Sequence, residues 1–190
     1  SHTPRRPGAP GGPVAKGRQR SRRGSVGTQG HCGETTTGHA THGGIHGHGD
    51  KLEALLRQMG YSVSGLGYKA PAGRQVVFLG DLIDRGPRQL RVLEIARAMV
   101  DSGHARCILG NHEMNAIGYM TEDAVNPGEY LRPNRGASYK CIKNREQHAA
   151  FIAAVRQGSA VHKRWLAWFK TLPPFLDLGG IRVVHGCWDN

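Results

Sequence analysis

The chain has 190 residues, enough for one domain with a hydrophobic core, and carries a formal net charge of +12. No apolar run approaches the roughly 18 residues that cross a membrane, and the arginine-rich start lacks the apolar stretch of a signal peptide. The four cysteines include no C-x-x-C pair and are too sparse for a disulfide-stapled secreted domain. We therefore expect reduced thiols, a cytoplasmic location and no membrane partner.

Residues 1–43 differ in composition from the rest of the chain. They contain ten Gly, four Pro, seven Lys or Arg and one acidic residue, and their only large aliphatic side chains are Val14 and Val26. Such a stretch buries too little apolar surface to offset the entropy of ordering, so we expect a disordered basic tail before a folded region over 44–190. Seven bases less one acid give this tail +6 of the +12 charge.

The spacing of apolar residues predicts alternating helices and strands after the tail. A strand, a helix and a second strand follow one another between residues 75 and 109, which is the pattern of a βαβ unit in an α/β fold. The expected elements are, in chain order, a helix capped by Asp50 and stopped by Gly60, a turn-rich segment over 61–74, a strand over 75–79, a helix over 88–100, a strand over 106–109, an irregular excursion over 118–138, helices over 144–157 and 160–172, and paired strands over 175–178 and 181–184.

Two carboxylates and an arginine directly follow the first buried strand, in the octapeptide GDLIDRGP at 80–87. Asp81 and Asp84 stand three residues apart, and Arg85 is next to the second. A carboxylate with two free oxygens can bridge two divalent ions about 3.5–4 Å apart, the spacing of two-metal hydrolases. Any one of these residues alone would also fit a surface turn with local ion pairs.

Two further strands also end in polar side chains that could bind metal. The second buried strand is followed by GNHE at 110–113, and the last strand delivers His185. Taken alone, Asn111 would fit a helix cap and His185 a hydrogen-bonded histidine at the edge of the core. Because sites assemble at the carboxyl ends of strands in α/β sheets, the three endings together favour a functional site.

The order of these motifs resembles the calcineurin-like metallophosphoesterases. The matching segments are His46-Gly47, GDLIDRGP at 80–87, GNHE at 110–113 and VHG at 184–186. The similarity is greatest to the phosphoprotein-phosphatase branch, which includes bacterial Ser/Thr phosphatases and dinucleoside-polyphosphate hydrolases. It implies the N-terminal half of an α/β/β/α sandwich over about residues 44–190.

The resemblance also implies a pair of divalent metal ions, with manganese as the leading candidate and iron or zinc as alternatives. His46 would bind the first ion, Asp81 would bridge the two, and Asn111 and His185 would bind the second. The substrate would be a phosphoprotein or a nucleotide, and the reaction would be hydrolysis of a phosphate ester or phosphoanhydride.

Three residues of the same motifs would serve the reaction of the substrate, two of them by direct contact. His112 would protonate the leaving oxygen, Asp84 would orient and charge-stabilise the imidazole of His112, and Arg85 would bind the phosphate. These roles agree with the chemistry, since a dianionic phosphate needs cationic partners and an alkoxide leaving group needs an acid. Glu113 is expected to support or cap its neighbours rather than to bind metal.

The sequence departs from the family pattern in two places. The first family motif reads G-D-x-H-G, and here Gly44 stands where the aspartate ligand of the first metal belongs, so weaker binding and impaired turnover are expected. Residues 34–42 are Thr, Gly and His rather than the aliphatic residues of a central parallel strand, so we expect the sheet to lack its first strand.

Our hypothesis from these departures is that residues 1 to about 44 are mis-translated and that the chain is a fragment that ends before the last ligands. One alternative is a non-catalytic fragment that does not fold stably. Another is a basic tail that binds nucleic acid nonspecifically, which its lack of aromatic side chains for base stacking disfavours. The oligomeric state is not readable from the sequence.

Overall fold

A four-stranded sheet lies at the centre of the structure, a computed structural model that describes residues 33–34, 39–42 and 44–187. Three of its strands are parallel and the short first strand is antiparallel at one edge. The strand order is β1-β2-β5-β6, with the bounds β1 (Gly33–Glu34), β2 (His39–His42), β5 (Gln75–Phe78) and β6 (Ala105–Cys107).

The prediction that the sheet lacks its first strand is wrong. His39–His42 pairs in parallel with Gln75–Phe78, with His39 opposite Gln75. The hydrogen bonds of such a ladder join main-chain groups, so a neighbouring strand can hold a Thr- and His-containing segment in place without aliphatic side chains. Residues 33–34 and 39–42 of the segment predicted to be a disordered tail are assigned to strands, and the rest of that segment lies outside the described residues, so its disorder stays a prediction.

Helices cover one face of the sheet and form the main core with it. Val76 and Phe78 of β5 point into this core, where they join apolar side chains from the helices, such as Leu56, Leu93 and Phe169. The βαβ unit predicted over residues 75–109 is confirmed, because α2 connects the parallel strands β5 and β6. The helices are α1 (Gly49–Gln58), α2 (Gln89–Asp101), α3 (Asn111–Met120), α4 (Tyr139–Val155) and α5 (Ala160–Phe169).

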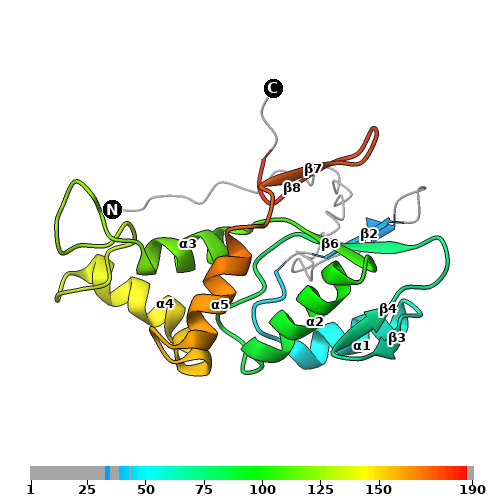
Figure 1. Cartoon of the computed structure of the whole chain (residues 1–190), viewed down its shortest axis with the longest axis horizontal. Helices are drawn as coiled ribbons and strands as arrows, with labels where there is room; N and C mark the ends of the chain where they lie inside the picture. Colours follow the sequence, from blue (N-terminus) through cyan, green and yellow to red (C-terminus); the bar gives the residue numbers. More distant parts are fainter. Residues whose placement is uncertain (1–32, 35–38, 43, 188–190) are drawn as a thin grey trace, which may run out of the picture.

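A β-hairpin packs on the opposite face of the sheet. It consists of β7 (Phe175–Asp177) and β8 (Arg182–Val184), as the sequence predicts. Val183 of β8 forms a small second core with Val77 of β5 and Ile108. Helices, sheet and hairpin therefore form successive layers, with the hairpin on the far side from α1 and α2 (Figure 1). This arrangement confirms the α/β fold class and its partial layered sandwich.

Several local expectations need correction. Asp50 does not cap α1, because the helix already begins at Gly49 and the Asp50 carboxylate pairs with the guanidinium of Arg88. Helix α4 begins five residues earlier than predicted, since the Ser138 hydroxyl accepts a hydrogen bond from the backbone N–H of Cys141 at 3.3 Å.

The turn-rich segment over 61–74 contains a second hairpin, formed by β3 (Ser62–Ser64) and β4 (Gly67–Lys69). Cys107, Cys141 and Cys187 are free thiols, and Cys32 lies outside the described residues. None of the helices in the described part of the chain is long and apolar enough to span a bilayer.

Candidate metal centre

Backbone hydrogen bonds fasten the loop that carries His46 to the loop that follows β5. The N–H groups of His46 and Gly47 each donate at 2.8 Å, to the carbonyls of Asp81 and Leu82 respectively. In return the N–H of Gly86 donates to the carbonyl of His46 at 2.7 Å. Main-chain hydrogen bonds therefore fix the position of His46 relative to Asp81.

The Glu113 carboxylate joins the loop after β5 to the start of α3. It is fully buried and accepts hydrogen bonds from three backbone N–H groups, those of Asp81 at 2.8 Å, Leu82 at 2.8 Å and Gly110 at 3.1 Å. Burial raises the pKa of Glu113, and the N–H groups of Leu82 and Asp81 work against that rise. The expectation that Glu113 caps and supports its neighbours is confirmed.

The same two loops touch at Gly80 and Gly110. A β-carbon on Gly80 would lie 2.3 Å from the backbone nitrogen of Gly110, and one on Gly110 would lie 2.3 Å from the backbone nitrogen of Asp81. No side chain fits in either place, so glycine is required at both for the loops to approach this closely.

Two histidines face the two oxygens of the Asp81 carboxylate from opposite sides. His46 Nδ1 lies 3.3 Å from the carbonyl of Ile83, and His185 Nδ1 lies 2.5 Å from the carbonyl of Leu79. Because a carbonyl only accepts, each Nδ1 carries a proton, which leaves the lone pair of a neutral ring on Nε2. His46 Nε2 is 3.7 Å from Asp81 Oδ2, and His185 Nε2 is 3.4 Å from Asp81 Oδ1.

Asn111 adds a fifth electron-rich atom to this cluster. Its Oδ1 lies 2.8 Å from His185 Nε2 and faces the Asp81 carboxylate as well, so that acceptors meet acceptors. Either the amide is turned, so that its nitrogen donates to both neighbours, or a cation belongs between them. Imidazole nitrogen, carboxylate and amide oxygens suit a divalent ion such as Mn²⁺, so these residues fit a metal pair bridged by Asp81.

His112 stands beside this cluster and is hydrogen-bonded to Asp84. Its Nδ1 lies 2.6 Å from Asp84 Oδ2, and the bond to Asp84 raises the pKa of His112. Burial alone would raise the pKa of Asp84, but its hydrogen bonds from histidine outweigh this and its pKa is lowered. His46, Asp81 and His112 each offer one ligand atom, and these three atoms lie within 4.8 Å of one another. By this geometry His112 could also share a cation with His46 and Asp81.

Arg85 lies at the exposed rim of the site. Its charge contributes, after burial, to the lowered pKa of His46. A lowered pKa keeps His46 in the neutral form that a metal requires. The structure thus brings all seven predicted site residues to one edge of the sheet, and their individual roles remain predictions.

Strained backbone marks the same loops. Among the described residues, five other than glycine have positive φ, and four of them are site residues: His46 at 45°, Asp81 at 52°, Asp84 at 71° and Arg85 at 65°. Such conformations each cost on the order of 1–3 kcal/mol and persist where the surrounding structure holds them in place, most often at functional sites. The strained backbone at these four residues is therefore consistent with a functional site.

Gly44 leaves space beside His46. A β-carbon at this position would lie 3.6 Å from His46 Nε2, an ordinary contact distance, and the backbone there has φ of 67°. A side chain at this position would therefore start beside Nε2 of His46, and Gly44 itself supplies no ligand atom there.

Two supporting residues escaped the sequence analysis. His148 of α4 donates to Asp84 Oδ1 at 2.9 Å, and the Gln89 side-chain oxygen accepts from the Asp84 backbone N–H at 2.8 Å. Gln89 follows the GDLIDRGP motif closely enough to suggest a local contact. His148 is 64 residues from Asp84 and gave no local signal.

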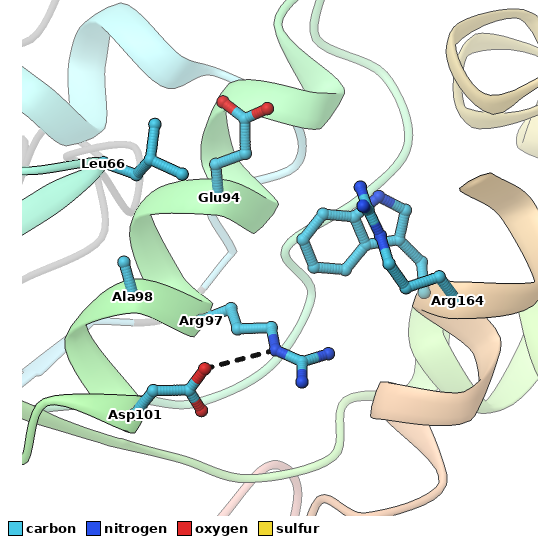
Figure 2. A pocket seen from close by; sticks show the side chains of 7 residues that line it. Leu66, Glu94, Arg97, Ala98, Asp101 and Arg164 are labelled. Atoms are coloured by element: carbon cyan, nitrogen blue, oxygen red, sulfur yellow. Dashed lines mark hydrogen bonds and ion pairs between the residues drawn. The ribbon is translucent and has the colours of Figure 1, made fainter.

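A cavity of about 430 Å³ lies elsewhere, between α2 and α5 (Figure 2). It contains none of the motif residues, and its charges are mixed, since Arg97 is paired with Asp101 at 3.3 Å. Figure 2 shows Arg164 across this cavity from α2. The guanidinium carbon of Arg164 lies 5.2 Å from the centroid of the Trp165 ring. Unlike the edge of the sheet, this cavity has no converging ligand atoms.

Comparison with known proteins identifies relatives of this chain. The sequence model described as calcineurin-like phosphoesterase matches residues 42–186. A bis(5'-nucleosyl)-tetraphosphatase PrpE, designated asymmetrical, from Oceanobacillus iheyensis is 39% identical over 142 residues, which are 75% of this chain and 52% of the relative. A symmetrical bis(5'-nucleosyl)-tetraphosphatase from Vibrio campbellii is 36% identical over 151 residues, 77% of this chain and 45% of the relative.

Among solved structures, a serine/threonine phosphatase from Saccharomyces cerevisiae aligns with a TM-score of 0.46 at 17% identity, over 74% of this chain and 35% of that one. The chain spans about half the length of the curated relatives from Oceanobacillus and Vibrio.

Proposed function

Because the chain belongs to the calcineurin-like phosphoesterase family, we propose that its site binds two divalent cations and hydrolyses phosphoric ester or anhydride bonds. The observation that carries the proposal is the Asp81 carboxylate, whose two oxygens face the Nε2 atoms of His46 and His185. One oxygen and one imidazole would serve each cation, and Asn111 would complete the second set. When bound, the cation pair supplies Lewis acidity and activates water.

The residues beside the metal ligands would act on the substrate. Arg85, exposed at the rim, would bind phosphate oxygens. His112 has a raised pKa and is held by Asp84, so it would carry a proton to the leaving oxygen as the bond from phosphorus breaks. Asp84 would keep the His112 ring oriented and would stabilise its positive charge.

The proposed substrate class is the dinucleoside polyphosphates. Support comes from the names of the two relatives, which are bis(5'-nucleosyl)-tetraphosphatases of asymmetrical and symmetrical kinds. Manganese is the proposed metal, with iron and zinc as alternatives. Because Gly44 offers no carboxylate, we propose that the ion on the His46 side binds more weakly than the ion on the His185 side.

The test is hydrolysis of diadenosine tetraphosphate by the purified chain with Mn²⁺, with the products separated by anion exchange. AMP with ATP would indicate asymmetrical cleavage, and ADP alone would indicate symmetrical cleavage. Asp81→Asn should abolish turnover, whereas Asp101→Asn, on the exposed side of α2, should not change it. Absence of turnover in the unaltered chain, or turnover that persists in Asp81→Asn, would overturn the proposal.

A further inference from the structure

Asp84 is shared between two histidines. His112 Nδ1 lies 2.6 Å from its Oδ2, and His148 Nδ1 lies 2.9 Å from its Oδ1. His148 comes from α4, has 2% of its surface exposed, and is not part of any motif of the metal centre. Both oxygens of the carboxylate are therefore occupied, one of them by a side chain that the proposed reaction does not use.

The partners of His148 define which of its ring nitrogens carries the proton. A carboxylate at 2.9 Å accepts, so Nδ1 of His148 carries the proton and donates it. Its Nε2 is buried and has no hydrogen-bond partner among the described residues. The ring is surrounded by aromatic side chains, with the centroid of Tyr119 at 5.0 Å and that of Phe151 at 5.1 Å.

Packing alone does not explain an imidazole in this place. A buried nitrogen without a partner is unfavourable, and a leucine or phenylalanine would fill an aromatic cluster without that cost. The one polar contact that His148 makes in the described structure is its bond to Asp84. The contact with Asp84 is therefore the physical reason for a histidine here.

We infer that His148 is a positioning residue that fixes the rotation of the Asp84 carboxylate so that Oδ2 stays directed at His112. This inference rests on the proposed function, because it gives His112 the task of protonating the leaving group. A carboxylate held at one oxygen can turn about its terminal torsion, and the terminal torsions of Asp are broad. With the second oxygen held by His148, and the backbone N–H of Asp84 held by Gln89, the ring of His112 keeps one orientation.

His148 itself transfers no proton in this scheme. In the reaction the oxygen of water bonds to phosphorus and the water gives up a proton to solvent, while the bond from phosphorus to the leaving oxygen breaks. The proton that the leaving oxygen gains comes from His112, which solvent then protonates again. Loss of His148 should therefore affect substrates in proportion to how much their leaving group needs that proton. A packing role would instead affect all substrates alike.

The experiment compares His148→Leu, which removes the donor at similar volume, with His148→Asn, whose amide nitrogen can stand where Nδ1 does. His162→Leu is the matched control, since His162 is also buried, its ring lies 5.6 Å from that of Phe151, and its Nδ1 accepts a hydrogen bond from the backbone N–H of Gly158 at 3.1 Å. Each variant is assayed with Mn²⁺ on p-nitrophenyl phosphate, a good leaving group, and on an alkyl phosphate, a poor one.

In His148→Leu, kcat on the alkyl phosphate should fall by about 10–100-fold, the range seen when a supporting partner of a site residue is removed. Its kcat on p-nitrophenyl phosphate should fall much less. His148→Asn should recover most of the loss, and His162→Leu should leave the ratio of the two rates unchanged. An equal loss on both substrates, or no loss, would overturn the inference.

A second measurement does not depend on turnover and separates failure of this inference from failure of the proposed function. In the zinc-loaded chain, the Nδ1 proton of His112 should give a downfield NMR resonance, because it is held against a carboxylate. That resonance should broaden or shift in His148→Leu and persist in His148→Asn. If the unaltered chain hydrolyses neither ester, the proposed function fails, while an unchanged resonance in His148→Leu would overturn the role of His148.

Discussion

Replacing Glu113 by glutamine tests whether one buried carboxylate holds the loop after β5 against the start of α3. In the structure Glu113 Oε2 accepts from the backbone N–H groups of Asp81 and Gly110, and Oε1 accepts from that of Leu82. Glutamine has a single acceptor oxygen. In its better orientation the amide keeps the two bonds at the Oε2 position and sets its own NH₂ group against the N–H of Leu82.

The cost follows from these contacts. One buried donor without a partner is unfavourable by about 1–3 kcal/mol, and the two remaining bonds lose the strength of a charged acceptor, roughly 1 kcal/mol together. Removing a buried charge works in the opposite direction, because burial raises the pKa of Glu113 and so disfavours its ionised form. We expect a net loss of about 2 kcal/mol in the free energy of unfolding.

Urea denaturation measures this loss, and a change of that size lowers the midpoint by about 1 M for a typical slope. Titration calorimetry with Mn²⁺ should show weaker binding as well, because the backbone of Leu82, next to Asp81, loses its hydrogen bond. Glu146→Gln is the matched control, since Glu146 is exposed on α4 and should change stability by less than about 0.5 kcal/mol. A Glu113→Gln variant that unfolds at the midpoint of the unaltered chain would refute the reasoning.

Three further predictions concern other parts of the site and core. Gly44→Asp should tighten Mn²⁺ binding by about tenfold or more, since it adds an anionic ligand beside His46, and unchanged calorimetric affinity would count against that placement. The pKa of Asp84 is lowered in the folded state, so its contribution to stability is present above the ordinary aspartate value of about 3.9 and is lost as pH falls through the lowered value. Urea midpoints below about pH 4 should therefore fall more steeply in the unaltered chain than in Asp84→Asn, and parallel curves would contradict this. Phe169→Ala, in the main core, should lower the free energy of unfolding by about 3–5 kcal/mol, and a loss under 1 kcal/mol in denaturation would show that the position is not packed as described.

The sequence predicted those parts of the site that local patterns encode. The motifs of Asp81 and Asn111 each follow a predicted strand, and parallel strands end at the same edge of a sheet, so these two residues could be placed together from spacing alone. His185 was harder, because β8 belongs to a separate hairpin on the other face of the sheet. His185 reaches the site because Val183 packs against Val77 and Ile108. The His185 ring also donates a hydrogen bond to the carbonyl of Leu79.

The features that escaped prediction depend on contacts between distant segments. Helical periodicity places His148 on the buried side of α4 with Phe151, but that pattern also fits an apolar packing position and gives no sign of Asp84. The strand at His39–His42 escaped for a related reason. Its backbone partners come from β5, more than thirty residues later in the chain, whereas its own residue types are those expected in a loop.

The backbone contact between Gly80 and Gly110 has a consequence for how this protein tolerates change. Because main chain rests on main chain there, the separation of Asp81 from Asn111 does not depend on the size or shape of any core side chain. Apolar residues beneath the sheet can therefore be exchanged over generations while the distance between the backbones of these two residues stays constant. His185 lacks this independence, because its strand is held by the packing of Val183.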